Sequence, residues 1–209
     1  MPHYFITGTD TDAGKTYVTC LLLDSLRRQG KQVAGYKPVA CGDRGDALAL
    51  LSSSSPENVN LELVNPSWFK APAAPYVAGL LENKQVDVDS LLGGFHVLAA
   101  CHDSVLVEGA GGWEVPLTDR LTMADLAQKL GLPVILVVNN KLGAINHTLL
   151  SLRAIEASGL TCAGIILNHV ADERDPASIS NRAVIERFGQ VPILLEVMHG
   201  ETTVDWPLD

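Results

Sequence analysis

The sequence predicts an α/β protein, a single domain with a doubly wound, mostly parallel sheet flanked by helices. Short apolar runs alternate with segments of helical periodicity along most of the chain, and this pattern is typical of a parallel sheet wrapped by helices. Aromatic residues make up only 5% of the chain and apolar residues 47%, so aliphatic side chains must build most of the core. The length of 209 residues favours one domain, residues 1–209.

Six apolar runs are expected to form the strands. A strand that is covered on both faces has a continuous apolar sequence rather than an alternating one. The runs are 4–7, 32–36, 104–107, 134–138, 164–167 and 191–195.

Amphipathic segments lie between these runs and are expected to form helices. The first places Val18, Leu21, Leu22 and Leu26 on one face and ends at Gly30 after a basic last turn, which is a typical helix stop. The other predicted helices are 46–51, 88–100, 122–130, 148–158 and 176–188.

Residues 52–75 fit neither pattern. Serines and prolines are mixed there with a few apolar residues. We expect a long excursion from the sheet rather than a linker, because Trp68, Phe69 and Tyr76 can anchor it by burying aromatic surface.

Charge and composition exclude several classes of protein. The net charge of −9 lacks the basic footprint of a nonspecific nucleic-acid binder. No apolar run reaches the roughly 18 residues of a membrane span, and the first residues lack a signal-peptide pattern. We therefore expect a cytoplasmic protein with neither nucleic-acid nor membrane partners. The four scattered cysteines contain no C-x-x-C pair, which disfavours a metal cluster and a disulfide framework.

The first predicted strand runs directly into a glycine-containing loop, residues 8–16, and then into the first helix. The backbone N–H groups of such a loop and the helix N-terminus bind phosphate. Lys15 is expected to reach the β- and γ-phosphates and Thr16 to bind Mg²⁺ through its hydroxyl. The interval from Gly8 to Gly14 is one residue longer than the usual pattern, but the arrangement still predicts nucleotide binding and a P-loop NTPase fold.

Three charged residues near other predicted strands are candidates for the same site. Glu108 follows the run 104–107, and Lys37 follows the run 32–36 just before a proline. The carboxyl ends of parallel strands meet at one edge of the sheet, where open α/β sheets bind ligands. Asp46 opens the next helical segment and is expected to serve the site rather than only to cap that helix.

Five segments carry a resemblance to a known family. They are 7–16, 35–39, 46–48, 107–112 and 142–147. The Thr-Asp-Thr of the long loop and the Gly-Tyr-Lys-Pro run are the most specific parts. Together the segments resemble the dethiobiotin synthetase family.

The resemblance implies an enzyme, a cyclo-ligase of biotin biosynthesis that requires ATP and Mg²⁺. Such an enzyme converts 7,8-diaminopelargonate, CO₂ (or bicarbonate) and a nucleoside triphosphate, ATP, into dethiobiotin, the matching diphosphate, ADP, and phosphate, through a carbamate and a carbamic-phosphoric anhydride. It also implies a homodimer with the active site at the interface.

The resemblance also implies roles for individual residues. The catalytic residues are Thr11, Lys15 and Lys37. The Mg²⁺ ligands are Thr16, Asp46 and Glu108. The nucleotide contacts are Asp12, Ala13, Gly14, Lys15, Thr16, Tyr17, Glu108 and Asn168. The substrate contacts are Thr11, Lys37, Cys41, Gly111, Gly143, Ile145 and Asn146, the last three acting across the dimer interface.

One residue, Cys41, departs from the family pattern. Two other classes of protein share parts of that pattern. Cys41 stands where the family usually has serine, and a thiol is a weaker hydrogen-bond donor than a hydroxyl. A partition-type regulatory ATPase would carry a further lysine where this chain has Asp10. A cobyrinate-type amidoligase would usually be longer, with an added glutaminase domain.

Overall fold

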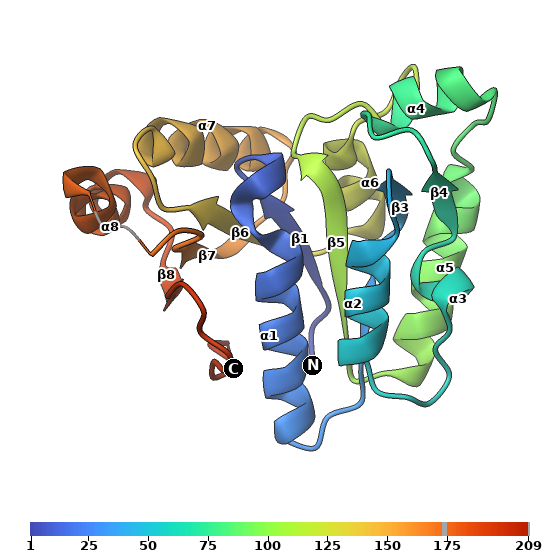
Figure 1. The fold of residues 1–209 in the computed structure, drawn as a ribbon, viewed down its shortest axis with the longest axis horizontal. Helices are drawn as coiled ribbons and strands as arrows, with labels where there is room; N and C mark the ends of the chain where they lie inside the picture. Colours follow the sequence, from blue (N-terminus) through green and yellow to red (C-terminus); the bar gives the residue numbers. More distant parts are fainter. Residues whose placement is uncertain (173–174, 209) are drawn as a thin grey trace.

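A parallel sheet of six strands forms the centre of the computed structural model, which describes residues 1–172 and 175–208 (Figure 1). The strand order is β2-β5-β1-β6-β7-β8, and every neighbouring pair is parallel. The strands are β1 (Tyr4–Gly8), β2 (Val33–Tyr36), β5 (Ser104–Gly112), β6 (Val134–Asn139), β7 (Cys162–Asn168) and β8 (Ile193–Val197). The doubly wound α/β prediction is therefore confirmed.

Helices cover both faces of this sheet. The main ones are α1 (Lys15–Arg28), α2 (Gly45–Ser53), α5 (Val88–Cys101), α6 (Met123–Leu130), α7 (Ala144–Ala157) and α8 (Pro176–Gly189). Helices α1 and α2 pack on one face, and α5, α6 and α7 on the other, with α8 against α7. Among the described residues, no helix is long and apolar enough to cross a membrane.

The core is divided between the two faces because successive strand residues point in opposite directions. In β1, Tyr4 and Ile6 pack with Leu22 of α1, whereas Phe5 packs with Phe95 of α5 on the other face. All five are nearly or fully buried. Burial of each large side chain contributes about 1.5–3 kcal/mol, so packing against the sheet is what holds the helices in place.

The excursion contains elements that the sequence pattern did not predict. They are α3 (Leu61–Val64) and β4 (Ser67–Phe69), followed by α4 (Pro75–Glu82). Strand β4 pairs in parallel with β3 (Val39–Cys41), which was also not predicted. Phe69 is buried and the indole of Trp68 donates to the carbonyl oxygen of Gly42, so these two of the three expected aromatic anchors hold the segment. The third, Tyr76, is only partly buried.

Two predicted boundaries differ in ways that affect the site. Strand β5 runs on to Gly112, which pairs with Gly8, because its glycines continue the strand instead of turning. Glu108 therefore lies within β5, fully buried, and not beyond its end. Helix α7 begins at Ala144 rather than at residue 148, directly after Gly143, which has a φ of 92°.

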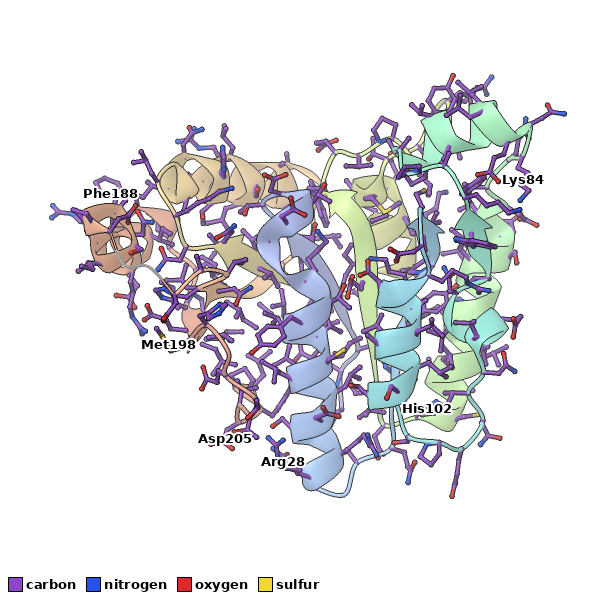
Figure 2. The ribbon with its side chains drawn as sticks, in the orientation of Figure 1. Arg28, Lys84, His102, Phe188, Met198 and Asp205 are labelled. Carbon is purple, nitrogen blue, oxygen red and sulfur yellow. The ribbon has the colours of Figure 1, made fainter. Side chains whose placement is uncertain are left out.

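The C-terminal segment after β8 lies along α1. The Tyr17 hydroxyl donates to the carbonyl oxygen of Glu201, and the guanidinium of Arg28 donates to that of Val204. Trp206 packs edge-on against Tyr4. Figure 2 shows Arg28 at the end of α1, with Met198 and Asp205 in the neighbouring segment.

The adjacent glycines of α5 give a test of this packing. Gly93 is exposed and a Cβ there would meet nothing within 4 Å, whereas a Cβ on Gly94 would lie 2.8 Å from the Tyr36 hydroxyl. We expect Gly93→Ala to stabilise the protein by about 0.5–1 kcal/mol and Gly94→Ala to destabilise it by about 1–3 kcal/mol. Urea unfolding followed by circular dichroism measures both.

The double variant Tyr36→Phe/Gly94→Ala is the control, since it removes the clashing hydroxyl. It should recover part of the stability that Gly94→Ala loses, relative to Tyr36→Phe alone. Equal effects of the two glycine substitutions would contradict this account of the packing.

Candidate active site

The phosphate loop connects β1 to α1 through a single turn of 3₁₀ helix, Thr11–Ala13. Gly14 has a φ of 82°, and a Cβ there would lie 2.1 Å from Nδ2 of Asn168. That amide donates to the carbonyl oxygen of Ala13 at 2.9 Å. Gly14 is thus required both by its backbone conformation and by the close approach of β7.

Lys15 is buried at the base of the loop. Its Nζ donates to the carbonyl oxygens of Asp10 and Thr11 at 3.0 and 3.2 Å. Burial lowers the pKa of Lys15 to about 8, and the positive charge of Lys37 acts in the same direction. A phosphate placed over the loop would supply the counter-charge that this ammonium lacks.

The second part of the site is a cluster of charged side chains from three elements. Lys37 Nζ lies 2.7 Å from Oδ2 of Asp46 and 2.6 Å from Oε1 of Glu108. The Thr16 hydroxyl donates to the same Oε1 at 2.7 Å. Asp46 lies in the first turn of α2, whose N-cap is Arg44. The cap position is thus taken by another residue, and the Asp46 carboxylate is directed at the site.

The ion pairs of this cluster set its protonation. Burial alone would lower the pKa of Lys37, but the carboxylates of Glu108 and Asp46 outweigh it and raise that pKa. Partial burial would raise the pKa of Asp46, yet the neighbouring Lys37 ammonium holds it below its ordinary value. Lys37 is therefore cationic and Asp46 anionic at neutral pH.

The oxygen atoms of this cluster fit a magnesium ion. Mg²⁺ binds carboxylate and hydroxyl oxygens, usually one or two carboxylates together with phosphates and waters, and Thr16, Asp46 and Glu108 supply such a set. Oε2 of Glu108 is buried with no hydrogen-bond partner, so this carboxylate has capacity for a further cation contact.

A clamp that the sequence did not reveal fixes Lys37 and α2 relative to each other. The buried Asn65 donates to the carbonyl oxygens of Lys37 and Ser67 at 2.8 and 3.0 Å. Its Oδ1 accepts from Nε of Arg44, and the Arg44 guanidinium stacks on Trp68. The excursion therefore positions the site. No motif marks these residues, because their partners come from distant parts of the chain.

A cavity of about 380 Å³ opens beside this cluster. Of the predicted site residues it brings together Thr11, Lys37, Cys41, Asp46 and Gly111. Pro72, Ala73 and Pro75 from the excursion also line it, as does Val115, and none of these four was predicted.

The thiol of Cys41 lies in the wall of the cavity. Burial raises its pKa to about 11, and the negative charge of Glu82 adds to this effect. The side chain is therefore a neutral thiol at physiological pH, and it can offer a bound molecule only a weak hydrogen bond.

The remaining predicted residues lie outside the cavity. Gly143, Ile145 and Asn146 form the start of α7, where Gly143 and Asn146 are exposed. Asp12, in the phosphate loop, and Tyr17, in the first turn of α1, are both exposed. None of these five residues lines the cavity.

Asn168, at the end of β7, lies on the side of the phosphate loop away from Lys37. It is buried, and its Oδ1 has no hydrogen-bond partner. This oxygen is a free acceptor next to the loop.

Several solved structures have a fold similar to that of this chain. A ParA family ATPase from Chlorobium tepidum matches with a TM-score of 0.59 and 14% identity, over 96% of this chain and 86% of its own. The septum site-determining protein MinD from Pyrococcus horikoshii, complexed with Mg-ADP, matches with a TM-score of 0.60 and 18% identity, over 95% and 82%. These likenesses confirm the P-loop NTPase fold.

Sequence relatives are much more similar. A family model described as an AAA domain matches residues 3–202. The ATP-dependent dethiobiotin synthetase of Akkermansia muciniphila is 49% identical over 98% of this chain and 96% of its own length. Those of Aromatoleum aromaticum and Yersinia pestis are 42% and 40% identical, over 94% and 96% of this chain and 90% and 88% of theirs. The resemblance indicated by the sequence motifs is confirmed, and the chain belongs to the ATP-dependent dethiobiotin synthetase family.

Proposed function

We propose that this protein closes the cyclic urea of dethiobiotin, using 7,8-diaminopelargonate, CO₂ and ATP, and that it works as a cytoplasmic homodimer. Membership of the family supports the reaction. The observation that carries the assignment of the site is the cavity that joins the phosphate loop, through Thr11, to Lys37 and Cys41. Partition-type ATPases share the fold but not this degree of sequence identity.

The reaction forms every new bond between substrates. One amine adds to CO₂ and loses a proton, which gives a carbamate. A carbamate oxygen attacks the γ-phosphorus of ATP, and ADP leaves with the electron pair of the broken P–O bond. The second amine then attacks the carbon of the resulting carbamic-phosphoric anhydride and loses a proton, and phosphate leaves as the ring closes. The protein has to position these groups and stabilise their charge.

Lys15, Lys37 and Thr11 are proposed to surround the reacting groups. Thr11 and Lys37 both line the cavity, and Lys15 Nζ lies within 3.2 Å of the Thr11 carbonyl oxygen. The two ammonium groups would stabilise negative charge on the transferring oxygens. The loop backbone around Asp12, Ala13 and Gly14 would contact the phosphates.

Thr16, Asp46 and Glu108 are proposed to hold Mg²⁺. When bound, the ion would neutralise charge on the β- and γ-phosphate oxygens. The glycines that follow Glu108 in β5 bring the backbone close to the cavity, and Gly111 lines it.

The start of α7 is proposed to serve the second subunit of the dimer. Gly143 and Asn146 are exposed, and the N–H groups of a helix N-terminus favour an anion. These residues and Ile145 would bind the substrate carboxylate in the partner's cavity, which explains why they lie outside their own.

Asn168 is proposed to contact the nucleotide base, with Tyr17 on the same side of the loop. The unpartnered Oδ1 of Asn168 suits an amino group such as that of adenine, because a buried acceptor without a donor is unfavourable.

The decisive experiment is incubation with 7,8-diaminopelargonate, bicarbonate, Mg²⁺ and one nucleoside triphosphate at a time, with detection of dethiobiotin by mass spectrometry. We expect product with ATP. Absence of product with every nucleotide would overturn the proposed function.

Removal of either lysine should abolish turnover. We expect Lys15→Ala and Lys37→Ala each to lower kcat by about 10²–10³ or more, because charge on the transferring oxygens loses its partner. Circular dichroism checks that the variants fold. Lys31→Ala, at the opposite edge of the sheet from the site, is the control, and full activity of Lys37→Ala would remove that residue from the mechanism.

Loss of one carboxylate should weaken metal binding. We expect Glu108→Gln to raise the Mg²⁺ concentration for half-maximal rate by about tenfold or more, because an anionic ligand becomes a neutral one. Steady-state rates over a Mg²⁺ titration measure this. Glu114→Gln, an exposed carboxylate just beyond β5, is the matched control. A Glu108→Gln saturation curve like that of the unmodified protein would contradict the role.

A further inference from the structure

The ammonium of Lys37 lies where the proposed metal ligands converge. Its contacts are Oδ2 of Asp46 at 2.7 Å, Oε1 of Glu108 at 2.6 Å and, more distantly, the carbonyl oxygen of Gly109 at 3.5 Å. Oε1 of Glu108 also accepts from Thr16. An internal cation is thus bound to one oxygen of each of the two carboxylates that would hold Mg²⁺.

Glu108 needs a cation beside it at all times. Its side chain is fully buried, and that of Lys37 is 4% exposed. A buried carboxylate without a counter-ion is strongly unfavourable. Because Lys37 already meets this need at Oε1, a free divalent ion gains less from this carboxylate than it would if the ammonium were absent.

On Oε1 of Glu108 the two cations would lie close together. A magnesium ion about 2.0–2.1 Å from this oxygen would lie within about 4.7 Å of Nζ in its present position. Like charges so close in a buried site repel strongly. This repulsion favours a move of the ammonium away from Oε1 when the ion binds.

We propose that Lys37 and the divalent cation occupy the cluster of Thr16, Asp46 and Glu108 in turn, so that Lys37 sets the order of binding. The metal binds weakly on its own and strongly with the nucleotide, and its arrival directs Lys37 into the cavity. The proposal rests on the proposed function, since it takes these residues as the metal ligands.

The phosphates make this exchange favourable. Lys15 is also engaged within the protein, on the carbonyl oxygens of Asp10 and Thr11. A polyphosphate chain offers charged oxygen partners to both lysines in place of those they give up. Free metal brings no such partners, so it meets the ammonium of Lys37 as a competitor.

The test is Mn²⁺ binding to the nucleotide-free protein, measured by electron paramagnetic resonance. Lys37→Gln removes the charge but keeps a donor for Glu108, and we expect it to bind Mn²⁺ at least about tenfold more tightly than the unmodified protein. Lys37→Arg keeps the charge and should show no gain. Lys15→Gln is the matched control, because it removes a nearby positive charge that touches no carboxylate.

Three results would overturn the exchange. The first is equal Mn²⁺ affinity of Lys37→Gln and the unmodified protein. The second is an equal gain in Lys15→Gln, which would show only a general charge effect. The third is a gain that survives addition of Glu108→Gln, which would place the ion elsewhere.

The metal measurement needs no turnover, so it fails or succeeds separately from the dethiobiotin assay. With a non-hydrolysable ATP analogue present, the difference in Mn²⁺ affinity between Lys37→Gln and the unmodified protein should shrink. A difference as large as that without nucleotide would also count against the proposal.

Discussion

The buried contact between Lys37 and Glu108 is the interaction on which the active site depends. Glu108 lies inside β5, and Lys37 follows β2, its neighbour in the sheet. A fully buried carboxylate requires a cation beside it. Because β2 pairs with β5, Lys37 at the end of β2 supplies that cation. Thr16 and Asp46 then complete the group from α1 and α2. The charge balance of the site is thus a direct result of parallel pairing between β2 and β5.

Much of the fold followed from the sequence because its strands are covered on both faces. Such strands are continuous apolar runs, and all six runs proved to be strands of the sheet. The short elements β3, α3 and β4 were not foreseen. They are too brief for a periodic pattern, and their stability comes from tertiary contacts such as that between Trp68 and Gly42.

The site was predictable to the extent that strand ends determine it. Lys15, Thr16, Lys37 and Asp46 lie at one edge because parallel strands all end there, and Glu108 reaches the same group from within β5. The clamp of Arg44 and Asn65, and the wall formed by Pro72 and Pro75, could not be predicted. Their positions depend on the tertiary contacts of residues 52–75, and no spacing of residues in the sequence indicates those contacts.

The strand order also has a consequence for how the chain is made. Strand β5 lies between β1 and β2, whereas β6, β7 and β8 follow one another outward from β1. The part of the chain from β6 onward can therefore be added to a sheet edge strand by strand as it leaves the ribosome. Lys15, Lys37, Asp46 and Glu108 all precede β6, and so the charged cluster can assemble while the remainder is still being synthesised.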